Sequence, residues 1–103
     1  MKIKWDPTAR ASFRQVARYI NTKFGRKARQ EFLQWVKDVE NLIKQSPNIG
    51  FIDPLFSERP QTYRSFIVNN LNKMVYREDG DVIYIVAFWD TRMEPEQQAS
   101  KVK

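Results

Sequence analysis

Residues 63–95 read YRSFIVNNLNKMVYREDGDVIYIVAFWDTRMEP, and this stretch decides the fold. Runs rich in valine, isoleucine, tyrosine and phenylalanine, separated by short polar clusters, are typical of strands joined by turns. Asp79-Gly80 suits a two-residue hairpin loop, because both loop positions need a positive φ. A second, less sharply defined turn is expected near Asn70-Leu71-Asn72, with Asn70-Leu71 as its loop. The stretch therefore predicts three consecutive antiparallel strands.

The two turns also assign side chains to the two faces of the sheet, because side chains alternate along a strand. These loops place Arg77 opposite Val82 and Arg64 opposite Arg77. A shift of one residue at either turn would exchange the faces. The outer face is then expected to carry Arg64, Phe66, Lys73, Arg77 and Tyr84. The core face is expected to carry Ile67, Met74, Tyr76, Ile83, Ile85, Ala87 and Trp89.

The N-terminal half predicts one short strand and two helices. Residues 2–5 alternate polar and apolar and are expected to join the same sheet. Asp6-Pro7 is a helix start, since Asp accepts from free N–H groups and Pro suits the first turn. This helix ends at Phe24-Gly25, and a second runs from about residue 26 to residue 45, before Pro47. Their apolar stripes are Ala9, Phe13, Val16, Ala17 and Ile20, and Ala28, Phe32, Val36, Val39 and Ile43.

The expected order is β-α-α-β-β-β in an α+β fold, with a helical hairpin packed on one face of a small antiparallel sheet. Residues 48–62 contain prolines and a glycine and are expected to be irregular. The 103 residues suit one domain, 1–103, with one core.

Composition narrows the function classes. The chain has no cysteine and no histidine, which excludes thiol chemistry, cysteine-ligated metals and a histidine base. No apolar run approaches the ~20 residues of a membrane span, and MKIKWDPTAR is not a signal peptide, so a cytoplasmic protein is expected. The net charge of +6 favours an anionic partner, and the charge is concentrated in residues 1–50, where 11 Lys/Arg stand against 4 Asp/Glu. No metal, small-molecule cofactor or membrane partner is expected.

An ordered set of short motifs runs through these elements and resembles the RelE/ParE superfamily of toxins from bacterial type II toxin–antitoxin systems, often labelled plasmid stabilisation proteins. The motifs are Trp5-Asp6-Pro7, Tyr19-Ile20, Phe24-Gly25, Ala28, Ser46-Pro47, Gly50, Tyr63-Arg64-Ser65, the run KMVYR at 73–77 and the run FWDTRMEP at 88–95. The resemblance implies a small basic toxin held inactive by a cognate antitoxin, of which an acidic, partly disordered segment wraps the toxin and folds on it. It leaves two mechanisms open. RelE-like members are mRNA interferases that cleave mRNA on the ribosome, and ParE-like members inhibit DNA gyrase.

The resemblance to the RelE branch implies a catalytic set of Arg64, Lys73 and Arg92. These cations would stabilise the charge of the phosphorane during attack by a 2′-hydroxyl. The chain departs from that branch because Phe66 stands at a position that is usually basic, and no tyrosine follows Tyr84.

Further residues are expected to bind a partner or nucleic acid: Arg10, Arg14 and Arg18 on one helix face, and Phe66, Arg77 and Tyr84 on the sheet. The alternative for the charged positions is a solvated surface. The alternative for Phe66 and Tyr84 is packing under another segment. A third function is also open, in which a degenerate, non-toxic domain only binds antitoxin or nucleic acid.

Overall fold

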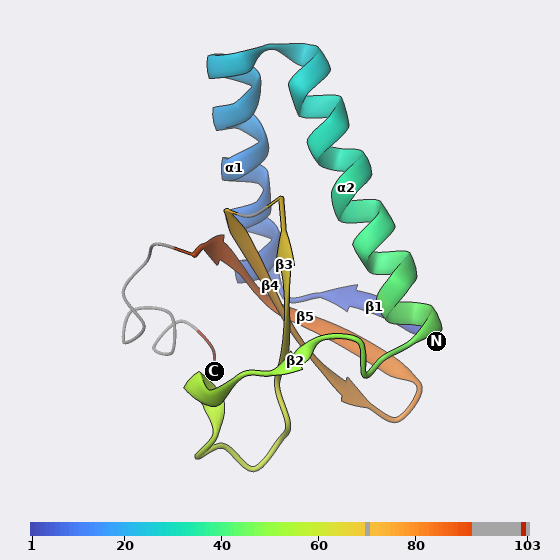
Figure 1. Cartoon of the computed structure of the whole chain (residues 1–103). Coiled ribbons are helices and arrows are strands. Elements are labelled where there is room, and N and C mark those ends of the chain that lie inside the picture. The colour runs from blue at the N-terminus through green and yellow to red at the C-terminus, as the bar shows by residue number, and fades with distance from the viewer. Residues whose placement is uncertain (70, 92–101, 103) are drawn as a thin grey trace.

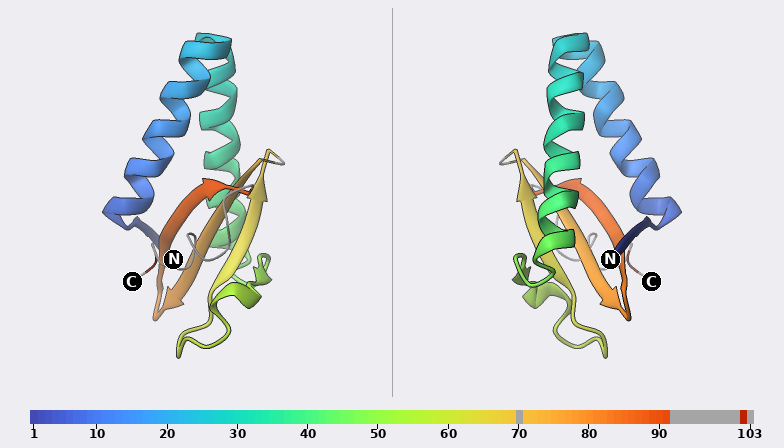
Figure 2. Two further views of the ribbon diagram at one scale, coloured as in Figure 1. Left: turned by 90° about the vertical axis from the view of Figure 1, so that its left-hand side faces the viewer. Right: turned by 90° about the vertical axis from the view of Figure 1, so that its right-hand side faces the viewer.

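The computed structural model describes residues 1–69, 71–91 and 102 (Figure 1). The elements follow the order β1 (Lys2–Trp5), α1 (Pro7–Phe24), α2 (Arg26–Gln45), β2 (Phe51–Ile52), the 3-10 helix η1 (Pro54–Phe56), β3 (Arg64–Val68), β4 (Asn72–Asp79) and β5 (Val82–Asp90). The predicted α+β fold with a helical hairpin on a sheet is confirmed. The helices lie against one face of the sheet, and their closed end projects beyond it (Figure 2).

Both ends of α1 are set by the residues that predicted them in the sequence. The Asp6 carboxylate accepts a hydrogen bond from Thr8 N at 3.0 Å, and Pro7 occupies the first turn. Gly25 lies between the helices with a φ of 95°, a conformation that favours glycine, and its N–H donates to Asn21 O. The connection is therefore short enough to fold α2 back against α1.

The sheet has five strands in the order β1-β5-β4-β3-β2. β1 pairs with β5 in parallel, so the sheet is mixed and not wholly antiparallel as expected. β1 runs toward the start of α1 in the same direction as β5, and Lys2 N–H to Asp81 O and Asp6 N–H to Ile85 O extend their pairing at both ends. The other edge strand, β2, lies in the segment expected to be irregular and pairs with the start of β3.

The β3–β4 register differs from the prediction by one residue. Val68 pairs with Asn72, which leaves positions 69–71 between the strands in place of a two-residue loop, and Asn69 has a φ of 48°. Arg64 consequently lies opposite Tyr76, and Phe66 lies opposite Met74. Both side chains therefore belong to the helix-covered face, and the expectation that they share the outer face with Lys73 is wrong.

The β4–β5 hairpin turns at Gly80-Asp81, with Gly80 at a φ of 63°, one position later than predicted. Arg77 pairs with Tyr84 and not with Val82, a shift that keeps both side chains on the same face. An irregularity between Val75 and Tyr76 of β4 then lets Val86 bulge from β5.

The bulge reverses the alternation along the rest of β5. Phe88 therefore faces the helices, and Ala87 and Trp89 lie on the other face. The prediction that Ala87 and Trp89 belong to the helix-covered core face is wrong.

Apolar side chains are buried on both faces of the sheet. The helix-covered face holds the main core, which includes the predicted Met74, Tyr76, Ile83 and Ile85. On the other face, Phe56 and Tyr63 cover Val75 and Trp89, together with Val102. Ile67, predicted to be core, is exposed on this second face. The second core fixes the segment between α2 and β3 against the sheet, which explains why that segment is ordered.

Candidate functional site

Arg64 begins β3 on the helix-covered face and holds the segment that follows α2. Its Nη1 donates to Gly50 O at 2.9 Å and to Asn48 O at 3.4 Å. The same segment is held by Tyr76, whose hydroxyl donates to Pro47 O at 2.7 Å and accepts from Gly50 N at 2.9 Å. Burial raises the pKa of the Tyr76 phenol above its ordinary value, so the hydroxyl keeps the proton that it donates. Arg64 therefore has a structural role in this network.

Lys73 points to the opposite face of the sheet, where its Nζ lies 2.8 Å from Asp53 Oδ2. The Asp53 side chain is 4% exposed and also accepts from Ser65 Oγ at 2.7 Å and from Leu55 N at 3.0 Å. Burial alone would raise the pKa of this carboxyl, but the hydrogen bonds from Lys73, Ser65 and Leu55 N outweigh it and lower the pKa below its ordinary value. Lys73 is thus the counter-ion of a buried carboxylate that caps η1.

The structure does not bring together the two predicted catalytic residues that it describes, Arg64 and Lys73. A set of cations that stabilises one phosphorane must converge on one point. Arg64 and Lys73 lie on opposite faces of the sheet, and each is already hydrogen-bonded within the fold. The third member, Arg92, lies outside the described residues.

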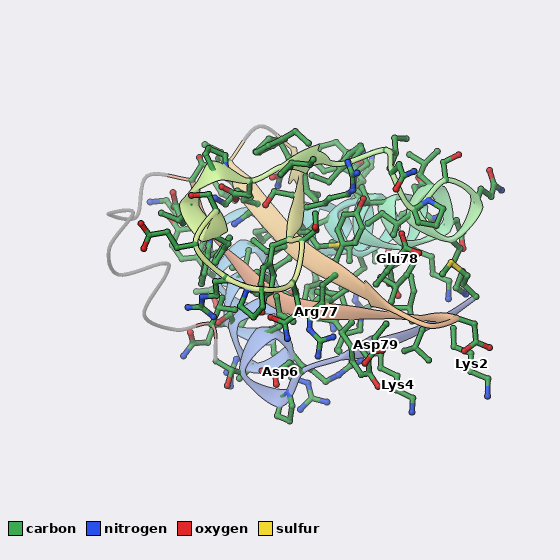
Figure 3. The ribbon with its side chains drawn as sticks, turned by 90° about the horizontal axis from the view of Figure 1, so that it is seen from below. Lys2, Lys4, Asp6, Arg77, Glu78 and Asp79 are labelled. Atoms are coloured by element: carbon green, nitrogen blue, oxygen red, sulfur yellow. The ribbon has the colours of Figure 1, made fainter. Side chains whose placement is uncertain are left out.

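Of the predicted binding residues on the sheet, Arg77 and Tyr84 lie side by side. The Arg77 guanidinium carbon is 4.8 Å from the centre of the Tyr84 ring, and Arg77 Nη1 is 3.7 Å from Asp79 Oδ2. Figure 3 shows Arg77 and Glu78, neighbours in β4, on opposite sides of the strand. Phe66 packs against the main core and is not a stacking surface on the outer face.

The three helix arginines differ in their surroundings. Arg10 places its guanidinium over the Trp5 ring, 5.4 Å from the centre, at the base of the hairpin. Arg14 and Arg18 instead line a groove of about 610 Å³ together with Arg29 of α2. We call this the arginine groove. Its apolar lining includes Phe13, Ala17 and Leu33.

A second groove, of about 630 Å³, lies between the hairpin and the β3–β4 turn, and we call it the apolar groove. Its rim includes four large side chains that are half or more exposed: Tyr19 at 57%, Phe24 at 65%, Trp35 at 50% and Leu71 at 50%. Its described charged residues, Glu31 and Asp90, are both acidic.

Sequence reasoning missed both grooves. The apolar groove had a signal in the large apolar residues that flank the helix stripes, Trp35 among them. That Leu71 of the β3–β4 turn lines the same groove depends on the register of the sheet, which the sequence left open.

The described part of the chain contains no helix that is long and apolar enough to cross a membrane.

A comparison with curated proteins finds no significant match. Among solved structures, the chain is similar to a protein of the chromosomal ParDE toxin–antitoxin system from P. aeruginosa, with a TM-score of 0.69 and 21% identity over 87% of this chain and 95% of that one. At that identity the likeness concerns the fold. Residues 3–95 match the family described as the ParE toxin of the type II toxin–antitoxin system parDE. The match spans most of the sequence, and the chain therefore belongs to the ParE toxin family.

Proposed function

We propose that this protein is the toxin of a type II toxin–antitoxin module, and that it blocks DNA gyrase by binding it and not by cleaving RNA. The observation that carries the choice of mechanism is the separation of Arg64 and Lys73. The Arg64 guanidinium donates to Gly50 O, and the Lys73 ammonium donates to Asp53 on the other face of the sheet. The two groups are therefore not available to bind one common phosphate. Membership of the ParE family supports the same mechanism.

The apolar groove is the surface on which the cognate antitoxin would dock. Monomeric proteins rarely expose a contiguous set of side chains such as Phe24, Trp35 and Leu71, and such patches mark protein interaction sites. A groove between helices and a turn suits an amphipathic segment that inserts apolar side chains. Asn72 is buried in the same lining and makes no side-chain hydrogen bond within the described residues, so its amide is available to orient that segment.

The test is induced expression without antitoxin, followed by brief pulse labelling of DNA and protein synthesis. The proposal expects DNA synthesis to stop first, while cellular mRNA stays intact. Co-expression of the antitoxin encoded beside the toxin should restore growth. An early stop in translation, with mRNA cut inside translated frames, would instead establish the RelE-like mechanism. Growth without any arrest would identify the degenerate domain that only binds its antitoxin.

A further inference from the structure

Two grooves of similar volume flank the helical hairpin, and their charges differ in sign. The described residues that line the arginine groove include three cations, Arg14, Arg18 and Arg29, and no acid. Those that line the apolar groove include two acids and no cation. One partner segment would not be complementary to both surfaces, because like charges across an interface disfavour association. The hairpin thus has two chemically distinct surfaces.

The three arginines of the arginine groove are not explained by the stability of the fold. None of their side chains forms a hydrogen bond, an ion pair or a ring contact within the described part of the chain. Arg14 and Arg18 are one helical turn apart, a spacing at which like charges destabilise a helix. Arg10 provides the contrast within the same helix, since it packs on Trp5.

The lining between the arginines favours a protein segment over nucleic acid. Ala17 is buried and Leu33 is partly buried, so the base of the groove is apolar. Single-stranded nucleic acid needs free aromatic faces on which bases can stack. The aromatic ring here, Phe13, is partly buried and packs on Trp5, Phe32 and Phe88 beside the main core, so it is not a free stacking surface.

We propose that the arginine groove binds an acidic segment, bearing apolar side chains, of the protein that the toxin attacks. This inference rests on the proposed function, in which that protein is DNA gyrase. The division of roles follows from the surfaces. An antitoxin that remains bound is best held by the large exposed apolar side chains of the apolar groove, whereas a charged groove accelerates the encounter with a target. The toxin therefore carries separate surfaces for its inhibitor and its target.

The experiment compares the triple variant Arg14→Glu, Arg18→Glu, Arg29→Glu with the control variant Lys27→Glu, Lys37→Glu, Lys44→Glu. Both change the net charge equally, and the control residues are exposed on α2 and line neither groove. The measurements are growth arrest without antitoxin, inhibition of purified gyrase, and affinity for the purified antitoxin. The neutral variant Arg14→Gln, Arg18→Gln, Arg29→Gln separates loss of the guanidinium from charge repulsion, and thermal melting verifies folding.

The arginine variants should abolish growth arrest and raise the toxin concentration for half-inhibition of gyrase at least about tenfold, with antitoxin affinity changed by less than about threefold. The lysine control variant should match the parent in growth arrest, gyrase inhibition and antitoxin affinity. Retained toxicity would overturn the proposal, and so would an equal loss of antitoxin binding, which would assign the groove to the antitoxin. A parallel loss of affinity for a random-sequence DNA duplex would assign it to nucleic acid. If the parent arrests growth without inhibiting gyrase, the proposed target is wrong, while the growth readout still tests the groove.

Discussion

Arg64 and Lys73 occupy neighbouring strands but point to opposite faces of the sheet, and each forms a hydrogen bond that holds the segment between α2 and β3. Arg64 holds that segment from the helix side through Gly50 O, and Lys73 holds it from the other side through Asp53. Two cations that resemble parts of a nuclease site are thus the two ends of a structural clamp on β2 and η1.

The Asp53–Lys73 pair should stabilise the fold mainly by avoiding an unpaired buried charge. Lys73→Met alone leaves the Asp53 carboxylate without its counter-ion and should lower the free energy of unfolding by about 3–5 kcal/mol. Adding Asp53→Asn removes that charge, so the double variant should lose less free energy of unfolding than the sum of the losses in the two single variants. Chemical denaturation of the four proteins at pH 7 measures the coupling. Strict additivity would mean that the two side chains do not interact.

The same pair predicts a dependence of stability on pH. The pKa of Asp53 is lowered in the folded state, so as pH falls the unfolded chain takes up this proton first. The contribution is present above the unfolded pKa of about 4 and is lost as pH falls through the folded pKa. The free energy of unfolding of the parent should therefore exceed that of the variant Asp53→Asn, Lys73→Met by more at pH 7 than at pH 3. An equal difference at both pH values would contradict the assignment.

Gly50 should tolerate no side chain. A Cβ at this position would lie 2.8 Å from both Ser65 O and the Tyr76 hydroxyl oxygen, so β3 and the Tyr76 ring would have to move. Gly50→Ala should cost about 1–3 kcal/mol, as overpacking does elsewhere. Gly80→Ala is a comparison at an open turn, where only the positive φ of 63° opposes a side chain. Thermal melting should show the larger loss at Gly50, and equal losses would contradict the close approach.

Tyr76→Phe removes the hydroxyl without adding volume. It leaves Gly50 N–H and Pro47 O without this partner and should cost about 1–3 kcal/mol. Tyr84→Phe serves as the control, because the Tyr84 hydroxyl makes no hydrogen bond within the described residues. Denaturation curves that coincide for the Tyr76 variant and the parent would show that water replaces both bonds at no cost.

The apolar groove can be tested separately from the arginine groove. Trp35→Ala with Leu71→Ala should weaken antitoxin binding at least about tenfold, since large central side chains carry most of the energy of an interface. Leu42→Ala with Ile67→Ala is the matched control, because both residues are comparably exposed and line neither groove. Calorimetric titration with antitoxin gives the affinities. Equal losses in the two variants would place the antitoxin elsewhere.

The sequence predicted the helices well because their signals are local. Asp6-Pro7 begins α1 and Gly25 separates α1 from α2 where expected, and the apolar stripes pack on the sheet. The faces of β3 were wrong because one extra residue between Val68 and Asn72 reverses them, and no pattern in an Asn-rich turn fixes its length. The bulge at Val86 likewise depends on tertiary packing.

The candidate site was harder to predict for the same reason. Arg64 and Lys73 were assigned to one face by the incorrect register, and the partner of Lys73 lies in the segment expected to be irregular. Asp53 there is buried because η1, which follows edge strand β2, packs on the second face of the sheet, an arrangement that no short motif indicates. Arg14 and Arg18 were identified correctly as neighbours, but Arg29 joins them only through the packing of α2.

The most direct test of the account is the supercoiling activity of purified DNA gyrase titrated with the purified toxin, with and without its antitoxin. The account predicts that the parent and the variant Asp53→Asn, Lys73→Met inhibit supercoiling at similar concentrations, and that antitoxin reverses the inhibition in both. Undisturbed supercoiling at toxin concentrations that cut mRNA on ribosomes, with that cutting lost when Lys73 is replaced, would contradict the account and restore the catalytic assignment.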